Sequence, residues 1–300
     1  MFCIKKRLTL FVLAFSIFLS TFSIASASEI RAVATFPILA DLVKQVGKER
    51  VKVVSIVPLG ADPHTWEATP ADAKNVASAD ILFSNGLGFE LWLERLIENV
   101  AQADLPIIVL SEGLKARPGA SHDPHSHHEG DPHFWLNVQF AMEYVRNIER
   151  ALSEIDPDGA GVYQKNAEEY LNQLQELDNW LISQIKSIPE ENRRIITYHD
   201  GFGYLAERYG LSVEGFLVTN PDREPTALEM AKLTDMMKKF SRKVIFVEPQ
   251  ISSSHRYANA LAKEVSGKIS VLYSDTLTEE VPSYIDMMRF NGNSLVEALR

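Results

Sequence analysis

The chain has 300 residues, of which 46% are apolar and 23% charged, with 15 glycines and 14 prolines. This is the composition of a globular protein, and it excludes a disordered tail, a collagen-like repeat and a protein with several membrane spans. At about 150 residues per domain, the length predicts two domains. A chain of this size folds without a disulfide or a structural metal, so a bound metal would be cargo or catalyst.

Residues 1–27 predict a signal peptide. A basic cluster at residues 5–7 precedes an apolar run at 8–24, and the small residues ending at Ala27 fit a signal peptidase site. We expect cleavage after Ala27; the alternative is an uncleaved membrane anchor, because the run has the minimum length for a span. Cys3, the only cysteine, precedes the apolar run, where no lipoprotein cysteine occurs. The mature protein is therefore expected to be thiol-free and periplasmic.

Removing this leader takes away three of the 30 basic residues and none of the 40 acidic ones, which leaves a net charge of −13. A chain with scattered, mainly acidic charges is a poor binder of polyanions, so we expect no nucleic acid partner. The same charge is compatible with attracting cations.

In the first part of the mature chain, short apolar runs alternate with helical patterns. Strands are expected over residues 30–34, 51–57, 81–84 and 107–110, and helices over 37–46, 70–77 and 90–100. The last part repeats this scheme, with strands over 195–198, 213–216, 244–247 and 269–272 and helices over 202–209, 227–240, 254–265 and 284–299. The alternation predicts an α/β fold with two four-stranded parallel sheets, each with helices on both faces.

One long helix is predicted between the two halves. Apolar residues recur every three or four positions, as one face of a helix requires, at Tyr163, Ala167, Tyr170, Leu174, Leu177, Leu181, Ile185 and Ile188. A helix over 159–188 would be roughly 40–45 Å long, and Pro189 ends it; two shorter helices are the alternative. A continuous helix disfavours large hinge closure. The expected parts are a lobe at 28–156, a linking helix at 157–189 and a lobe at 190–300.

Asp-Pro-His occurs three times, and two copies extend to Asp-Pro-His-x-Trp, at His64 and His133. The proline restricts the backbone before each histidine, and the tryptophan is expected to supply an apolar wall. Such an imidazole loses little freedom on binding a metal. The alternative is two capped helix starts with incidental histidines. The third copy, at His125, lies in the polar segment 122–131, which we expect to be a surface loop.

Other candidate ligands follow predicted strands. His199 follows the strand at 195–198 and Asp275 the strand at 269–272, while His64 follows the strand at 51–57. Ligands of open parallel sheets bind beyond the carboxyl ends of the strands, so a cleft between the halves would collect these side chains. Taken singly, His199 or Asp275 could instead be an ordinary residue of the turn after its strand.

Three further residues have open roles. Glu248, at the end of the strand at 244–247, is either a fifth ligand or a hydrogen-bond partner for a ligand histidine. Glu67, three residues after His64, is a second candidate for a hydrogen-bond partner of a ligand histidine. His255 lies on a polar helix face and is expected to be exposed to solvent.

Five segments, taken in order, resemble the solute-binding protein 9 family, the zinc and manganese binding components of bacterial ABC importers. They are 60–67, 84–90, 131–136, 198–202 and 246–250. The resemblance covers essentially the whole mature chain. It implies two Rossmann-like lobes joined by one long helix, with a metal ion between them. The four ligand positions of the family fall on His64, His133, His199 and Asp275, and the segment 122–128 matches a His-rich loop of some zinc-binding members.

Three imidazoles and one carboxylate favour Zn²⁺ over Mn²⁺, which prefers oxygen ligands. In the family a carboxylate in place of the third histidine accompanies manganese, and here that position is His199. Mn²⁺ or Fe²⁺ remains the alternative, because geometry can override ligand type. The implied partners are an ABC transporter permease and its ATPase, and the protein is expected to be a monomer. Because ligand histidines must lose their protons, affinity is expected to fall below about pH 6.

The rival class is a secreted zinc hydrolase. Catalytic zinc usually keeps three protein ligands and an open position, whereas four protein ligands would close the shell. The sequence also lacks His-Glu-x-x-His and Gly-x-Ser-x-Gly motifs. We therefore expect a binding protein and not an enzyme. A surface adhesin is a third alternative, since some relatives of the resembled family are described that way.

Overall fold

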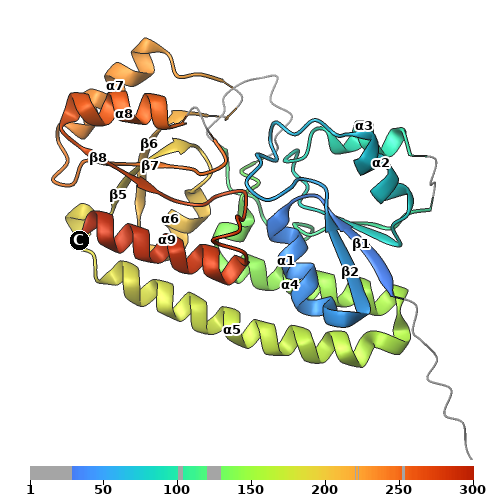
Figure 1. Ribbon diagram of the computed structural model, residues 1–300. Helices are drawn as coiled ribbons and strands as arrows, with labels where there is room; N and C mark the ends of the chain where they lie inside the picture. The colour runs from blue at the N-terminus through green and yellow to red at the C-terminus, as the bar shows by residue number, and fades with distance from the viewer. Residues whose placement is uncertain (1–28, 101–103, 120–129, 220, 222, 252–253) are drawn as a thin grey trace, which may run out of the picture.

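The computed structural model describes residues 29–100, 104–119, 130–219, 221, 223–251 and 254–300 (Figure 1). Two four-stranded sheets follow each other along this chain, with strand orders β2-β1-β3-β4 and β6-β5-β7-β8. All strand pairs in both sheets are parallel. The fold is therefore the predicted α/β arrangement of two Rossmann-like lobes, here called the N-terminal and C-terminal lobes.

The N-terminal lobe alternates strands and helices in the predicted order. Its elements are β1 (Ile30–Ala34), α1 (Pro37–Gly47), β2 (Val51–Ser55), α2 (Pro70–Ala77), β3 (Ile81–Ser84), α3 (Leu93–Glu98) and β4 (Ile107–Val109). All residues of the central strand β3 are buried, as expected for a strand covered on both faces. Helices α2 and α3 lie on one side of this sheet and α1 on the other (Figure 1).

The C-terminal lobe repeats this plan. Its elements are β5 (Arg194–His199), α6 (Gly203–Tyr209), β6 (Ser212–Val218), α7 (Ala227–Met237), β7 (Val244–Val247), α8 (Ser254–Val265), β8 (Lys268–Val271) and α9 (Tyr284–Leu299). Helices α7 and α8 cover one face of the sheet, and α6 and α9 lie on the face toward the long helix (Figure 1).

A single continuous helix, α5 (Ala160–Lys186), runs beneath both lobes for 27 residues (Figure 1). Its predicted apolar stripe from Tyr163 to Ile185 is buried, so the prediction of one helix is confirmed. Although α5 is long, neither it nor any other helix in the described residues is long and apolar enough to cross a membrane.

Some predicted boundaries differ from the structure. Strand β2 ends at Ser55, two residues before the predicted end, and α3 begins at Leu93 instead of residue 90. The structure also contains α4 (Val138–Ile155), an 18-residue helix beside α5 that the sequence analysis does not assign. The lobe boundaries at 156 and 189 stay predictions.

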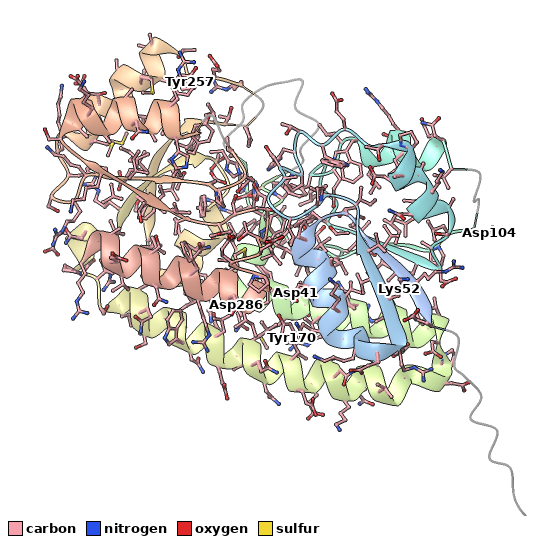
Figure 2. All side chains as sticks on the ribbon, in the orientation of Figure 1. Asp41, Lys52, Asp104, Tyr170, Tyr257 and Asp286 are labelled. Carbon is pink, nitrogen blue, oxygen red and sulfur yellow. The ribbon has the colours of Figure 1, made fainter. Side chains whose placement is uncertain are left out.

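One hydrophobic core joins the two lobes. It takes residues from both sheets and from α1, α4, α5, α6 and α9, while a smaller cluster lies under α7 and α8. Figure 2 labels Asp41, Tyr170 and Asp286 where α1, α5 and α9 approach one another. There the backbone N–H of Tyr284, the first residue of α9, donates to Asp41 of α1 at 2.8 Å. The lobes are thus fixed to each other beside the strand ends that face between them.

Candidate metal centre

The four predicted ligands lie together between the lobes. One ligand atom from each of His64, His133, His199 and Asp275 falls within 4.8 Å of the other three. His64 lies in the loop after β2, and His133 directly precedes the 3-10 turn Phe134–Leu136 that leads into α4. His199 is the last residue of β5, and Asp275 lies in the loop after β8. Three of the four therefore sit beyond or at the carboxyl ends of parallel strands, as predicted.

The spacing of the ligand atoms suits a tetrahedral cation site. The Nε2 atom of His133 lies 3.3 Å from that of His64 and 3.2 Å from that of His199. Carboxylate oxygens of Asp275 lie 3.5–3.6 Å from the three Nε2 atoms. Zinc–nitrogen bonds of about 2.0–2.1 Å in a tetrahedron separate the ligand atoms by about 3.3 Å. The four side chains therefore surround a space that fits such an ion.

The cluster is shielded from solvent, and one of its carboxylate oxygens lacks a hydrogen-bond partner within the described residues. The side chain of His64 is 9% exposed, and that of Asp275 is fully buried. Within the described part of the chain, Oδ1 of Asp275 has no hydrogen-bond partner. An unpartnered buried carboxylate oxygen is costly, and a cation between the four ligands would satisfy it.

Two carboxylates behind the cluster fix the orientation of two imidazoles. Asp131 Oδ1 lies 2.8 Å from Nδ1 of His133, and Glu248 Oε1 lies 2.7 Å from Nδ1 of His199. Because an ionised carboxylate only accepts, we assign the hydrogen to Nδ1 in both rings. In the neutral rings the Nε2 lone pairs then point into the cluster, as metal ligation requires.

The charges of the cluster shift the pKa values of its members. Burial acts to lower the pKa of His199, but the Glu248 and Asp275 carboxylates raise it to about 10. Burial acts to raise the pKa of Asp275, but the three neighbouring histidines hold it well below its usual value. In the absence of a metal ion, a proton on His199 therefore supplies positive charge to the centre.

Asp131 is itself held in its ionised form. Burial acts to raise the pKa of Asp131, but hydrogen bonding and charge from His133, together with the hydrogen bond from Arg117, hold it below its usual value. Arg117 Nη1 donates to Asp131 Oδ2 at 3.0 Å. The arrangement keeps a negative charge directly behind the His133 ring.

Aromatic rings wall the N-terminal side of the cluster. Trp135 lies 5.4 Å from the His133 ring, as the Asp-Pro-His-x-Trp motif predicts. Among the described ring pairs, however, the aromatic ring that packs against His64 belongs to Phe89, with 4.6 Å between ring centres, and not to Trp66 of the same motif. Phe89 also contacts His133, at 5.7 Å between ring centres. One phenyl ring thus packs against two of the candidate ligands.

The loop that carries Phe89 has an unusual backbone. Gly86, Leu87 and Gly88 all have positive φ, at 88°, 53° and 70°, a conformation that glycine adopts without steric cost. Glu90 is buried and closes this loop by accepting hydrogen bonds from the Asn85 N–H and the Thr35 hydroxyl, both at 2.7 Å. The segment 84–90, which carried part of the family resemblance, therefore positions the wall beside His64 and His133.

The remaining candidates take their places outside the ligand set. Glu248 contacts the far nitrogen of His199, which matches the partner role of its two predicted roles. Glu67 is exposed and does not belong to the cluster, and His255 is exposed as predicted. His122, His125, His127 and His128 lie outside the described residues. Asp131 and Phe89 are site residues that the sequence analysis did not identify.

Comparison with known proteins gives consistent matches over almost the whole chain. Residues 32–298 match the family model described as zinc-uptake complex component A, periplasmic. The manganese-binding lipoprotein MntA of Halalkalibacterium halodurans is 36% identical, covering 90% of this chain and 88% of that protein. The high-affinity zinc uptake system protein ZnuA of Bacillus subtilis is 33% identical, covering 92% and 89%. The structure of the periplasmic zinc binding protein TroA from Treponema pallidum superposes with a TM-score of 0.82 at 26% identity, covering 90% and 99%.

Fold, site and matches together define a metal-binding substrate-binding protein of an ABC transporter, which implies a metal ion, a permease and an ATPase as partners. The chain belongs to the family of zinc-uptake complex component A, which is the predicted solute-binding protein 9 family. Members of this family are substrate-binding proteins and not enzymes, so the hydrolase alternative is excluded. The relatives are named as lipoproteins or periplasmic proteins, which are extracytoplasmic.

Proposed function

We propose that this protein captures Zn²⁺ through His64, His133, His199 and Asp275 and delivers it to the membrane permease of its importer. The observation that carries this proposal is the set of three Nε2 atoms and one carboxylate with spacings of 3.2–3.6 Å. Three imidazoles in a closed, four-ligand shell match the ligand preference of zinc better than that of manganese.

Manganese or ferrous iron is the second candidate cargo. A relative with 36% identity is named manganese-binding, and the protein YfeA of Yersinia pestis, with 30% identity, is named iron-binding. Divalent ions of this series bind the same ligand types with different affinity. A direct comparison of zinc and manganese binding by this chain therefore decides between the two candidates.

Asp275→Ala tests the ligand set. Changes in outer hydrogen-bond partners typically cost 10–100-fold in metal affinity, so loss of a ligand should weaken zinc binding by more than about 100-fold. The measurement is competition against a chromogenic chelator. His255→Ala, at an exposed histidine outside the cluster, is the matched control and should bind like the wild type. Undiminished zinc affinity in Asp275→Ala would refute the assignment.

The metal identity has its own test. Mature protein purified without chelator or added metal should contain about one zinc per chain by elemental analysis. If manganese or iron is found instead, that ion is the cargo. If none of the three is found, the proposal that the protein captures a metal ion is wrong.

We further propose that the protein is secreted, cleaved after Ala27 and released as a periplasmic monomer. The support is the basic, apolar and small-residue order of residues 1–27, with Cys3 before the apolar run. Mass spectrometry of the mature N-terminus tests the cleavage. Recovery in the membrane fraction would contradict release, and a dimer in light scattering would contradict the monomer.

A further inference from the structure

Gln250 is a half-buried residue that follows β7 and faces the metal centre. Its Nε2 lies 2.8 Å from Ser274 Oγ, 3.1 Å from Glu248 Oε2 and 3.3 Å from Asp275 Oδ2. The Ser274 hydroxyl donates to Glu248, so its oxygen is free to accept from Gln250. Turning the amide over would place its carbonyl oxygen against two carboxylates, which fixes the NH2 group toward them.

The amide therefore contacts Asp275 directly. It also contacts Glu248, which is the hydrogen-bond partner of His199, the other candidate ligand of the C-terminal lobe. Asp275 receives a hydrogen bond from Gln250, and Glu248 in turn holds Nδ1 of His199 at 2.7 Å. Oε1 of Gln250 is buried and accepts no hydrogen bond within the described residues. Among the described residues, the contacts that orient the amide therefore all lie on the metal-centre side.

The two oxygens of Asp275 differ because of this contact. Oδ2 lies 3.5 Å from Nε2 of both His64 and His199 and accepts from Gln250. Oδ1 lies 3.6 Å from Nε2 of His133 and has no hydrogen-bond partner in the described chain. Both oxygens face the cluster, so the carboxylate is able to hold an ion through one oxygen or through two.

We propose that Gln250 is a positioning residue that sets metal selectivity by restricting how Asp275 binds the ion. Its N–H occupies a lone pair of Oδ2, which disfavours ligation through both oxygens at once and favours a four-coordinate shell. Zn²⁺ prefers four ligands, whereas Mn²⁺ prefers more oxygen ligands in an octahedral shell. Gln250 therefore favours zinc over manganese. This inference deepens the proposed function and depends on the same ligand set.

Gln250→Met tests the inference because methionine keeps the length of the side chain and removes the amide. Zinc affinity should fall by roughly tenfold or more, as for other lost partners of a metal ligand. Manganese affinity should fall less or rise, since the carboxylate becomes free to bind through both oxygens. The ratio of zinc to manganese affinity, measured by chelator competition, should therefore decrease by about tenfold.

Gln139→Met is the matched control. Gln139 also donates to a buried carboxylate, Asp178, at 2.8 Å, but this pair connects α4 with α5 and lies outside the ligand set. The control should lose stability and keep the wild-type affinity ratio. Equal losses of zinc and manganese affinity in Gln250→Met, or no loss of either, would overturn the inference.

A spectroscopic measurement separates coordination from simple destabilisation. Co²⁺ in the wild-type protein should show the intense visible bands of a tetrahedral site, and these should weaken in Gln250→Met as the coordination number rises. Unchanged bands would contradict the inference. If the wild type itself binds neither zinc nor manganese tightly, the proposed function fails; if it binds zinc and only the variant behaves unexpectedly, the role of Gln250 alone fails.

Discussion

His199 lies between two carboxylates, with Glu248 on Nδ1 at 2.7 Å and an Asp275 oxygen 3.5 Å from Nε2. These charges outweigh burial and raise the pKa of His199 to about 10. At neutral pH the imidazole therefore carries a proton when no metal is bound. A divalent ion replaces that proton, so metal binding releases a proton from His199.

This exchange predicts a pH-dependent affinity. Below a pKa of about 10 for His199, the bound proton competes with the metal, so apparent affinity should decrease as pH falls. Release of one proton per ion corresponds to about tenfold per pH unit, and the slope should steepen below about pH 6, where imidazoles generally protonate. Competition titrations at several pH values measure it. Zinc affinity that stays flat between about pH 5 and 7.5 would contradict this account.

The four side chains of the candidate metal centre could be predicted from the sequence because each occupies a distinctive local position, next to a strand end or in a repeated Asp-Pro-His motif. The partners behind them could not. In both motifs the aspartate accepts from the backbone N–H of its own histidine, at 2.9 Å for His64 and 3.0 Å for His133. Only Asp131 is found to reach the ring nitrogen as well, and this depends on side-chain torsions and on Arg117 from a separate segment.

At the scale of elements, α5 is connected to its neighbours through a buried carboxylate. Asp178 is fully buried and accepts from the Tyr209 hydroxyl at 3.0 Å, from Gln139 at 2.8 Å and from the Arg208 guanidinium. These donors come from α6 and α4. One side chain thus holds three helices together on the side of the molecule away from α7 and α8.

We expect Asp178→Ala to lower the free energy of unfolding by about 3 kcal/mol, because it removes a buried carboxylate and leaves the Tyr209 hydroxyl and the Gln139 amide without their acceptor. Urea denaturation measures the loss. Metal affinity should stay within about threefold of the wild type, since Asp178 is not a member of the ligand cluster. A stability change below about 0.5 kcal/mol, the usual range for surface positions, would contradict the structural role.

The elements differ in how well the sequence predicts them. The strands of both sheets are short apolar runs between turns and were predicted within a few residues. Helix α4 was not assigned, although Val138, Ala141, Val145, Ile148 and Leu152 form a buried stripe with helical spacing. The path of the loop at 86–88 was also unpredictable, because three successive positive φ values depend on packing against β4 and on the buried Glu90.

At the scale of the whole molecule, several contacts oppose a large movement of the lobes. Helix α5 is continuous beneath both lobes, and the core on its side includes residues of both sheets. The backbone N–H of Gly60 donates to Leu277 at 2.9 Å, and the Trp135 indole donates to Ser274 at 2.6 Å. Hinge closure needs loop residues that absorb rotation, and these two hydrogen bonds join the lobes close to the candidate ligands.

Metal binding should therefore change the overall shape little. We expect the radius of gyration in small-angle X-ray scattering to differ by less than about 1 Å between metal-free and zinc-loaded protein, as for preorganised binding partners. Asp275→Ala with added zinc serves as the control for metal effects unrelated to the site. A decrease of several ångströms would show that α5 does not prevent closure.

The order of the ligands along the chain has a consequence for biosynthesis. His64 follows the second strand and Asp275 follows the last one, so a growing chain lacks the complete set of candidate ligands until residue 275 has been synthesised. A nascent polypeptide presents its imidazoles one at a time, and His199 is synthesised before Glu248, its hydrogen-bond partner. We therefore expect tight retention of an ion only once nearly the whole chain has been made and the C-terminal lobe has folded against the N-terminal one.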